Sequence, residues 1–166
     1  MSEDNPTPGG EEQRVQVQIS LERIYLKDAS FESPGSPNIF AESFKPEMQV
    51  DINTRVNSLG DNRHEVVLRT TVTAKRDGDK VAYLAEIQQA GIFVVQGVNE
   101  TALRQVLGVH CPNMLFPYVR ESLDALIVKG NFAALQLAPV NFEMLYAQAV
   151  QQQQAAAAQE DIDVTH

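Results

Sequence analysis

Apolar and polar residues alternate along most of the chain between residues 15 and 95. In the first segment the apolar residues stand two apart, at Val15, Val17, Ile19 and Leu21. This is the period of a β-strand with one face toward water, and the shift of parity at Ile24 predicts a bulge or a change of face. The same period predicts strands at residues 48–56, 64–76 and 80–95, and the turn sequence RDGDK makes the last two a hairpin.

The connection between the first two predicted strands follows neither a strand nor a helix period. Residues 30–46, SFESPGSPNIFAESFKP, contain three prolines and predict a long ordered connection. Its large apolar residues are Phe31, Ile39, Phe40 and Phe44. Side chains this apolar need a surface to cover, so the connection is either a lid packed over the sheet or the wall of a groove.

The period becomes helical after the fourth strand. A short helix is predicted with Asn99 as its N-cap and Gly108 as its end. A last helix is predicted to begin at Asn141, with apolar residues at Phe142, Leu145, Tyr146 and Ala149. The Gln/Ala tract that follows has no apolar stripe, and we expect it to fray from this helix.

The longest helical pattern lies between these two helices. Its apolar stripe covers residues 115–126, and Lys129 with the glycine after it marks its end. Pro112 and Pro117 fit this helix only if it begins near Asn113 or bends there, because proline lacks the N–H that the helix interior uses.

Strands first and helices afterwards predict an α+β fold, a four-stranded antiparallel sheet with the C-terminal helices packed on one face. At 166 residues the chain has room for one domain, which we place at residues 14–150. A disordered acidic leader at residues 1–13 precedes it, and a mobile, acidic, Gln/Ala-rich tail at residues 151–166 follows. The face of the sheet without helices must meet water or a partner.

The charge of the chain excludes some partners. Lys and Arg number 13 against 22 Asp and Glu, a formal charge of −9, so phosphate backbones and anionic lipid repel the protein. We expect neither nucleic-acid binding nor membrane insertion, and a basic protein segment would be attracted. One cysteine and an acidic, Pro/Gly-containing start, unlike a secretory signal, predict a cytoplasmic protein.

Candidate chemistry is concentrated in one stretch, GVHCPNMLFPY at residues 108–118. Cys111 follows His110, and a thiol at a helix N-terminus can be a thiolate nucleophile. Adjacent side chains generally point apart, however, and free cysteine is among the most buried residue types, so a packed helix is the better interpretation. A cysteine-dependent enzyme stays open as an alternative. The three histidines lack metal-ligand spacing, and no glycine-rich phosphate loop is present, so no cofactor is expected.

Five stretches of the chain resemble the SecB family of protein-export chaperones. In order they are RIYLKDASFESP, EVVLRTTVTA, EIQQAGIF, CPNMLFPYVRE and LAPVNFEMLY, and the resemblance covers residues 15 to about 152. It implies a homotetramer, a dimer of dimers, that binds unfolded precursor proteins in the cytoplasm and delivers them to the motor SecA without using ATP or performing a reaction. A SecB-like chaperone dedicated to a toxin-antitoxin system is the alternative within this fold.

The resemblance also implies roles for particular residues. The family's SecA-docking positions match Asp28, Glu32, Leu84 and Glu86. Family positions that affect assembly match Ala85, Ile87 and Gln89, which the two-residue period places on the face opposite Leu84 and Glu86. Residues 151–166 are a candidate second docking element for SecA.

Two further sets come from the pattern and the family together. The helical stripe contains small residues beside larger apolar ones, which predicts a helix contact between copies of the chain through Leu115, Val119, Ser122 and Leu126. Burial inside one chain is the alternative. The family's client groove, between the connection, the second strand and the last helix, implies contacts from Phe40, Phe44, Met48, Val50, Ile52, Phe142 and Leu145. Each of these is equally a good core residue.

Overall fold

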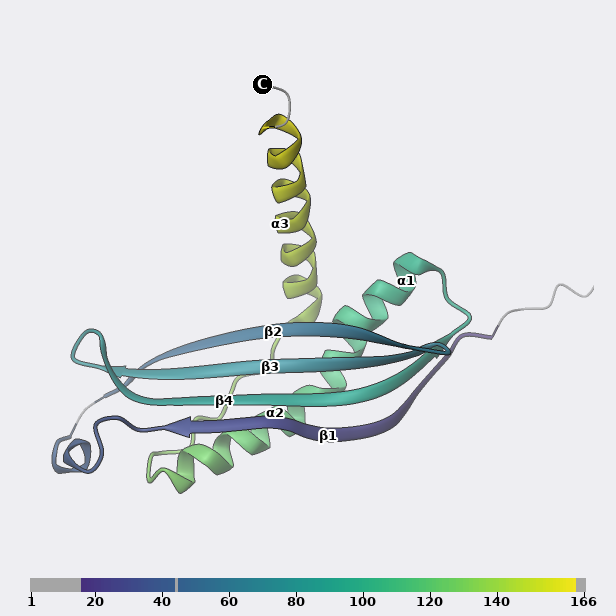
Figure 1. Cartoon of the computed structure of the whole chain (residues 1–166). Coiled ribbons are helices and arrows are strands. Elements are labelled where there is room, and N and C mark those ends of the chain that lie inside the picture. Colours follow the sequence, from purple (N-terminus) through teal and green to yellow (C-terminus); the bar gives the residue numbers. More distant parts are fainter. Residues whose placement is uncertain (1–15, 44, 164–166) are drawn as a thin grey trace, which may run out of the picture.

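The computed structural model describes residues 16–43 and 45–163 (Figure 1). The leader predicted at residues 1–13 and the groove residue predicted at Phe44 lie outside the described residues. The strands are β1 (Gln18–Glu32), β2 (Glu47–Gly60), β3 (Arg63–Arg76) and β4 (Lys80–Gln96). They form one antiparallel sheet in the order β1-β4-β3-β2, which confirms the predicted four-stranded sheet.

Irregular pairing of β1 accounts for the shift in its apolar parity. The register of β1 against β4 shifts between Leu21 and Arg23 and again between Leu26 and Asp28. Each shift changes which residues of β1 face a given side of the sheet. The strand also continues further than its alternation indicated, so Phe31 belongs to β1 and not to the connection. The connection itself contains a 3-10 turn, η1 (Asn38–Ala41), which buries Ile39.

The helices follow the sheet in sequence. They are α1 (Glu100–Gln105), the π-helical segment η2 (Val106–His110), α2 (Cys111–Lys129) and α3 (Phe142–Asp163). Asn99 caps α1 as predicted, because its Oδ1 accepts a hydrogen bond of 2.8 Å from the N–H of Ala102. The predicted end at Gly108 is wrong, since α1, η2 and α2 follow one another without a break. The N–H of Cys111 donates to the carbonyl of Val106, five residues back.

Gly108 is required by packing and not by helix termination. A Cβ atom at this position would lie 2.5 Å from Cδ2 of Tyr146, so only glycine lets α3 approach the helix here. The helix also accommodates both prolines, with Pro112 in the first turn of α2 and Pro117 inside it. α2 begins at Cys111, near the predicted start at Asn113, and the widened turn of η2 ends at His110, directly before it.

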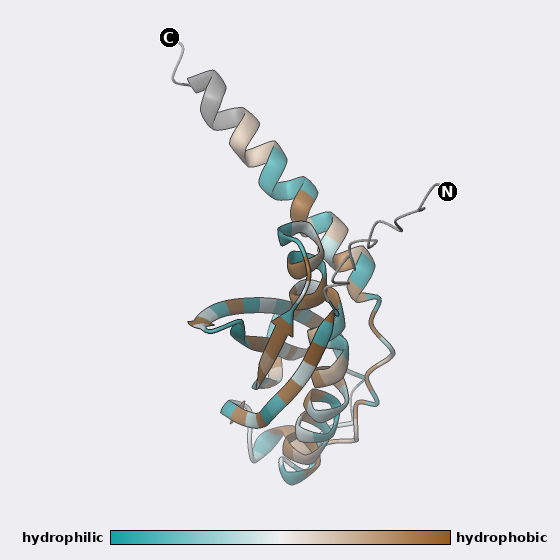
Figure 2. Ribbon diagram, turned by 90° about the vertical axis from the view of Figure 1, so that its right-hand side faces the viewer, coloured by the Kyte–Doolittle hydropathy of each residue, from teal (hydrophilic) through white to brown (hydrophobic). Residues whose placement is uncertain are grey.

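The core lies between α2 and the face of the sheet that we call the inner face (Figure 2). α2 buries one residue every fourth position, at Leu115, Val119, Leu123 and Ile127. On the sheet the largest fully buried side chains are Leu68, Ile87 and Phe93. Helices on one face of the sheet confirm the predicted α+β architecture.

α3 extends away from the sheet (Figure 1). Phe142 at its start is buried and packs edge-on against Phe116 of α2, with ring centroids 5.8 Å apart. The tract predicted as a tail from residue 151 continues α3 as far as Asp163, and residues 164–166 lie outside the described part of the chain. The mobility of this tract stays a prediction.

A polar cluster ties three strands together on the opposite, outer face of the sheet. Glu65 of β3 accepts hydrogen bonds from Lys27 Nζ at 2.8 Å, from Asn57 Nδ2 at 2.7 Å and from the hydroxyl of Tyr25. Tyr25 and Lys27 belong to β1, so their side chains reach across β4. The pKa of Glu65 is lowered from 4.5 to about 2, mostly by the hydrogen bond from Lys27 and to a smaller extent by those from Tyr25 and Asn57. Burial raises the pKa of Tyr25 to about 12, and the nearby carboxylate of Glu65 adds to this shift.

This cluster predicts an acid-sensitive contribution to stability. Because the folded-state pKa of Glu65 lies below 4.5, its carboxylate stabilises the fold above pH 4.5, and the stabilisation is lost as the pH falls toward about 2. Glu65→Gln should lower the free energy of unfolding by about 2 kcal/mol at pH 7, and its difference from wild type should shrink between pH 4.5 and pH 2. Urea unfolding at one fixed chain concentration measures both values.

The matched control is Glu47→Gln, which alters an exposed carboxylate of β2 and should leave the stability almost unchanged. A difference between wild type and Glu65→Gln that is the same at every pH would show that the side chain acts through its shape and not through its charge.

Candidate functional site

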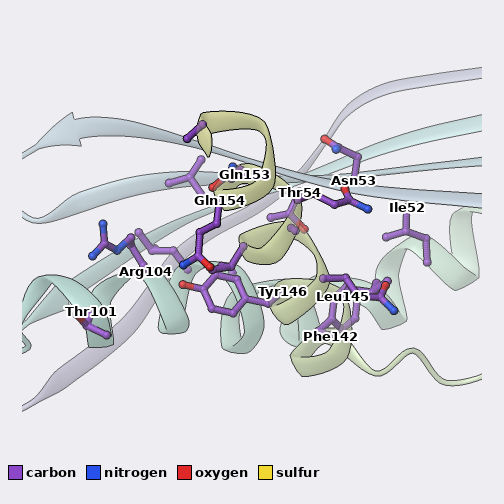
Figure 3. A pocket seen from close by; sticks show the side chains of 18 residues that line it. Ile52, Asn53, Thr54, Thr101, Arg104, Phe142, Leu145, Tyr146, Gln153 and Gln154 are labelled. Carbon is purple, nitrogen blue, oxygen red and sulfur yellow. The ribbon is translucent and has the colours of Figure 1, made fainter. Parts of the chain in front are cut away.

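A groove of about 960 Å³ lies between β2, the continuous α1-η2 helix and α3 (Figure 3). Its apolar lining comes from Ile52, Val56, Leu107, Phe142, Leu145, Tyr146, Ala149, Val150 and Ala157. Its polar lining comes from Asn53, Thr54, Thr101, Arg104, Gln148, Gln152, Gln153 and Gln154. A cavity of this size with an apolar floor and polar edges is suited to side chains of a bound ligand.

The groove exists because α3 is anchored by only a few side chains near its start. The ring of Phe142 is fixed against Phe116, and the ring of Tyr146 lies on Gly108. Asn141 accepts a hydrogen bond of 3.0 Å from the N–H of Met144 and so completes the first turn of α3. From this anchored turn the helix continues past the edge of the sheet, which leaves the groove between its side and β2.

An aromatic cluster occupies the opposite end of β2. Phe132, in the segment after α2, lies 4.7 Å from Tyr83 and 5.5 Å from Phe40 between ring centroids, and Phe31 stacks on Tyr83 at 5.8 Å. The Phe31 ring takes the space that a Cβ would need at Gly130. Phe40 keeps 47% of its surface exposed, so the cluster reaches solvent.

One row of β2 side chains connects the aromatic cluster to the groove. Register with β3 places alternate β2 residues on the inner face, namely Met48, Val50, Ile52, Thr54 and Val56. Met48 lies at the aromatic end, where its Sδ accepts a hydrogen bond of 3.9 Å from Tyr83, and Val56 lines the groove at the other end. The row is only partly covered, since Val50 and Val56 are both exposed.

The residues predicted for a client groove therefore divide between two places. Ile52, Phe142 and Leu145 line the groove, whereas Phe40 and Met48 adjoin the aromatic cluster and Val50 lies between the two. Sequence reasoning assigned neither Tyr83 nor Phe132 to a site, and it offered Phe31 only as one residue of a lid or a groove wall. Tyr83 was visible only as one apolar position in a strand, and Phe132 lies in a segment without any period.

The residues predicted to dock SecA share the outer face. Glu32 pairs with Leu84 and Asp28 with Gln88 in the β1-β4 register, so both carboxylates lie beside the outer row of β4. Glu86 accepts hydrogen bonds from Arg69 at 2.7 Å and from Thr71 at 3.0 Å, and the Arg69 contact lowers the pKa of Glu86. Asp28 and Glu32 are exposed, which leaves them as the more accessible charges of this set.

The residues predicted for assembly lie mostly in the core. Ala85, Ile87 and Gln89 are buried on the inner face, opposite to Leu84 and Glu86 as the strand period predicted. Leu115 and Val119 are fully buried against the sheet, the placement given by the alternative of burial inside one chain, whereas Ser122 and Leu126 are partly exposed.

The open side of α2 carries a different apolar set. Met114 is 37% exposed, Tyr118 49% and Val128 55%, and these residues share one side of the helix by their spacing of four and ten positions. Ser122 lies between them. Tyr118 lies within the apolar stripe predicted over residues 115–126, although it faces away from the core, because a helix with apolar residues on both sides gives no single period.

The Cys111-His110 pair is not arranged as a nucleophile and its base. The Cys111 side chain is fully buried, and this burial raises the pKa of its thiol to about 12, so the thiolate is disfavoured. His110 is exposed.

Residues 16–43 and 45–163 contain no cluster of three or more His, Cys, Asp or Glu able to hold a metal ion. None of the helices in this described part is both long and apolar enough to cross a membrane.

Comparison with known proteins shows which family this chain is similar to. The family model "Preprotein translocase subunit SecB" matches residues 12–153. The protein-export protein SecB of Marinobacter nauticus is 52% identical over 157 residues, which are 95% of this chain and 94% of that protein. The protein-export protein SecB of Hahella chejuensis is 53% identical over 140 residues, covering 84% and 87%.

A solved structure has the same fold. The SecB-like chaperone of Mycobacterium tuberculosis, in complex with a peptide from an antitoxin, superimposes with a TM-score of 0.58 over 74% of this chain and 90% of that chain. At 14% identity this likeness concerns the fold alone. The family match and the relatives at about half identity cover nearly the whole chain, and the chain belongs to the SecB family of protein-export chaperones.

Proposed function

We propose that this protein holds unfolded precursor proteins in the cytoplasm, without ATP, and passes them to SecA as a homotetramer built from two dimers. The observation that carries the proposal is the partly exposed apolar row of β2, which runs from the aromatic cluster to the groove. A soluble protein rarely leaves such a continuous apolar surface open unless it binds something there.

An extended, unfolded chain suits this surface better than a folded one. Its apolar side chains can reach the aromatic cluster and the groove in turn, and its backbone stays available for hydrogen bonds. Among the strands that the structure describes, β2 is an edge strand that pairs only with β3, so one side of its backbone has no described strand partner for its N–H and C=O groups. Several such surfaces in one oligomer would raise the affinity for a long client by about 10² to 10⁴.

Leu145→Asp should abolish most of the holding activity, because it places a carboxylate in the apolar floor of the groove. The purified wild type should slow the refolding of a denatured precursor protein, and the variant should slow it at least about tenfold less effectively at equal concentration. Refolding followed by intrinsic fluorescence of the precursor makes this measurement, since the chaperone contains no tryptophan.

The control is Met144→Asp on the neighbouring position of α3, which is exposed and does not line the groove. It should hold the precursor as well as wild type does. If the intact wild-type protein fails to delay refolding, or if both variants lose activity equally, the groove is not the client site.

The outer face is the proposed dock for a basic segment of SecA. Asp28 and Glu32 are held at fixed positions on β1, and four chains of −9 each would give the tetramer a formal charge of −36. A field of this sign attracts and orients a basic partner, and added salt weakens it. Leu84, paired with Glu32, supplies an apolar contact beside the charges.

Asp28→Asn combined with Glu32→Gln should weaken SecA binding about tenfold at low ionic strength and reduce its dependence on salt. Titration calorimetry at two salt concentrations measures both effects. Glu121→Gln with Glu143→Gln removes the same charge from exposed positions on the helices and should change SecA binding little. Equal losses in the two double variants would mean that only the net charge matters and that the outer face is not a specific dock.

The open side of α2 is the proposed helix contact between copies of the chain. Its exposed apolar residues would be buried by a second helix, and Ser122 would let that helix approach closely.

Tyr118→Asp should therefore convert tetramers to smaller species at micromolar concentration, as measured by light scattering. Met144→Asp, an exposed apolar position on another helix, should stay tetrameric. A Tyr118→Asp tetramer that survives dilution would exclude this face as the interface.

A further inference from the structure

Glutamines form much of the polar wall of the groove. Four of the residues that α3 contributes to the lining beyond Tyr146 are Gln148, Gln152, Gln153 and Gln154. Gln151 belongs to the same tract but does not line the groove. Figure 3 shows Gln153 and Gln154 on α3, about two turns beyond Tyr146. The part of the helix surface that lines the groove is broad, because Gln152, Gln153 and Gln154 are consecutive and successive residues of an α-helix are about 100° apart.

Among the side chains that the structure describes, the amides of these four have no partner. Across the described residues none of them makes a side-chain hydrogen bond, an ion pair or a ring contact. Each amide offers two N–H donors and one carbonyl acceptor. The groove thus has a set of uncommitted donors and acceptors along its wall, above a floor of apolar side chains.

The groove is almost without charge. Arg104 is the single charged residue in its described lining, and its Nη1 forms an ion pair of 3.2 Å with Glu100 on the preceding turn of α1. Thr54 on β2, across from α3, adds a hydroxyl. A wall of neutral amides neither selects nor rejects a ligand by its charge.

The feature that all unfolded polypeptides share is the backbone, with one N–H donor and one C=O acceptor at most positions. When an unfolded chain leaves water for an apolar groove, these groups lose their hydrogen bonds to water, and an unpaired group costs binding free energy. A glutamine amide can satisfy either group, because it both donates and accepts. An apolar wall could not, and a charged wall would favour only donors or only acceptors.

We propose that Gln148, Gln152, Gln153 and Gln154 bind the peptide backbone of the client, so that α3 recognises extended polypeptide without regard to its sequence. This inference rests on the proposed function, since it assigns the polar half of the same groove. The apolar floor takes the client's side chains, and the glutamines hydrogen-bond the N–H and C=O groups between them. In this arrangement the Gln tract is part of the client site and not a separate tail.

Amide-to-ester exchange in a model client tests the proposal. The probe is a labelled peptide of about twenty residues from the precursor used above, with an analogue in which alternate backbone amides are esters. An ester removes the N–H donor and weakens the carbonyl acceptor. Wild type should bind the ester analogue more weakly than the amide peptide, and the ratio of the two Kd values measures backbone recognition.

In the triple variant Gln148→Met, Gln152→Met and Gln153→Met this ratio should fall at least about fivefold, the equivalent of one neutral hydrogen bond or more. Methionine has a similar length and a similar helix propensity, so α3 should remain helical. Because the ratio compares two peptides on one protein, a general gain or loss of apolar affinity through methionine cancels. Gln151→Met is the matched control and should leave the ratio at its wild-type value.

The outcomes separate this inference from the proposed function. A triple variant with the wild-type ratio overturns backbone recognition by the glutamines, while loss of binding in Leu145→Asp would still support the groove as the client site. An equal fall in Gln151→Met also overturns it, because the effect would then not depend on the side facing the groove. A wild-type protein that binds neither peptide overturns both.

Discussion

The inner face of the sheet is wider than the one helix that covers it, and the rest of the structure depends on this mismatch. Four strands spaced about 4.8 Å apart span more than the width of about 10 Å that one helix provides. α2 packs mainly on β4 and β3, the central strands. The apolar row of β2 is left with partial cover at its edge, and this uncovered row joins the groove to the aromatic cluster. A second helix lying flat on the sheet would have closed the surface.

The sheet separates its two kinds of surface by alternation within each strand. In β4, Ala85 and Ile87 belong to the core, while Leu84 and Glu86 face outward. The outer face can therefore be polar and firmly ordered, as the Glu65 cluster across β1, β2 and β3 is, without any change in the packing under α2. One sheet of this size can thus present a surface for a specific partner on one face and a surface for varied clients on the other.

The features that were predictable from sequence are those with a local cause. Alternation gave the strands and their faces, and the Asn99 cap gave the start of α1. Gly108 was misinterpreted because a glycine at a helix end and a glycine beneath a crossing ring look identical in sequence, and only the position of Tyr146 distinguishes them. The aromatic cluster was missed for the same reason: Phe31, Tyr83 and Phe132 come from β1, β4 and the segment after α2, and their contact is created by the fold.

The Gln tract of α3 has little pattern in the sequence, and yet several of its residues line the groove. Its Gln/Ala composition predicted that it would fray from the last helix, whereas the structure continues α3 through it to Asp163. Its position follows instead from Phe142 and Tyr146, which fix the direction of α3 at its start. A helix that is anchored at one end and polar along its free length can hold neutral amides beside an apolar floor without burying them. Had the tract been apolar, it would have collapsed onto the β2 row and filled the groove that it now borders.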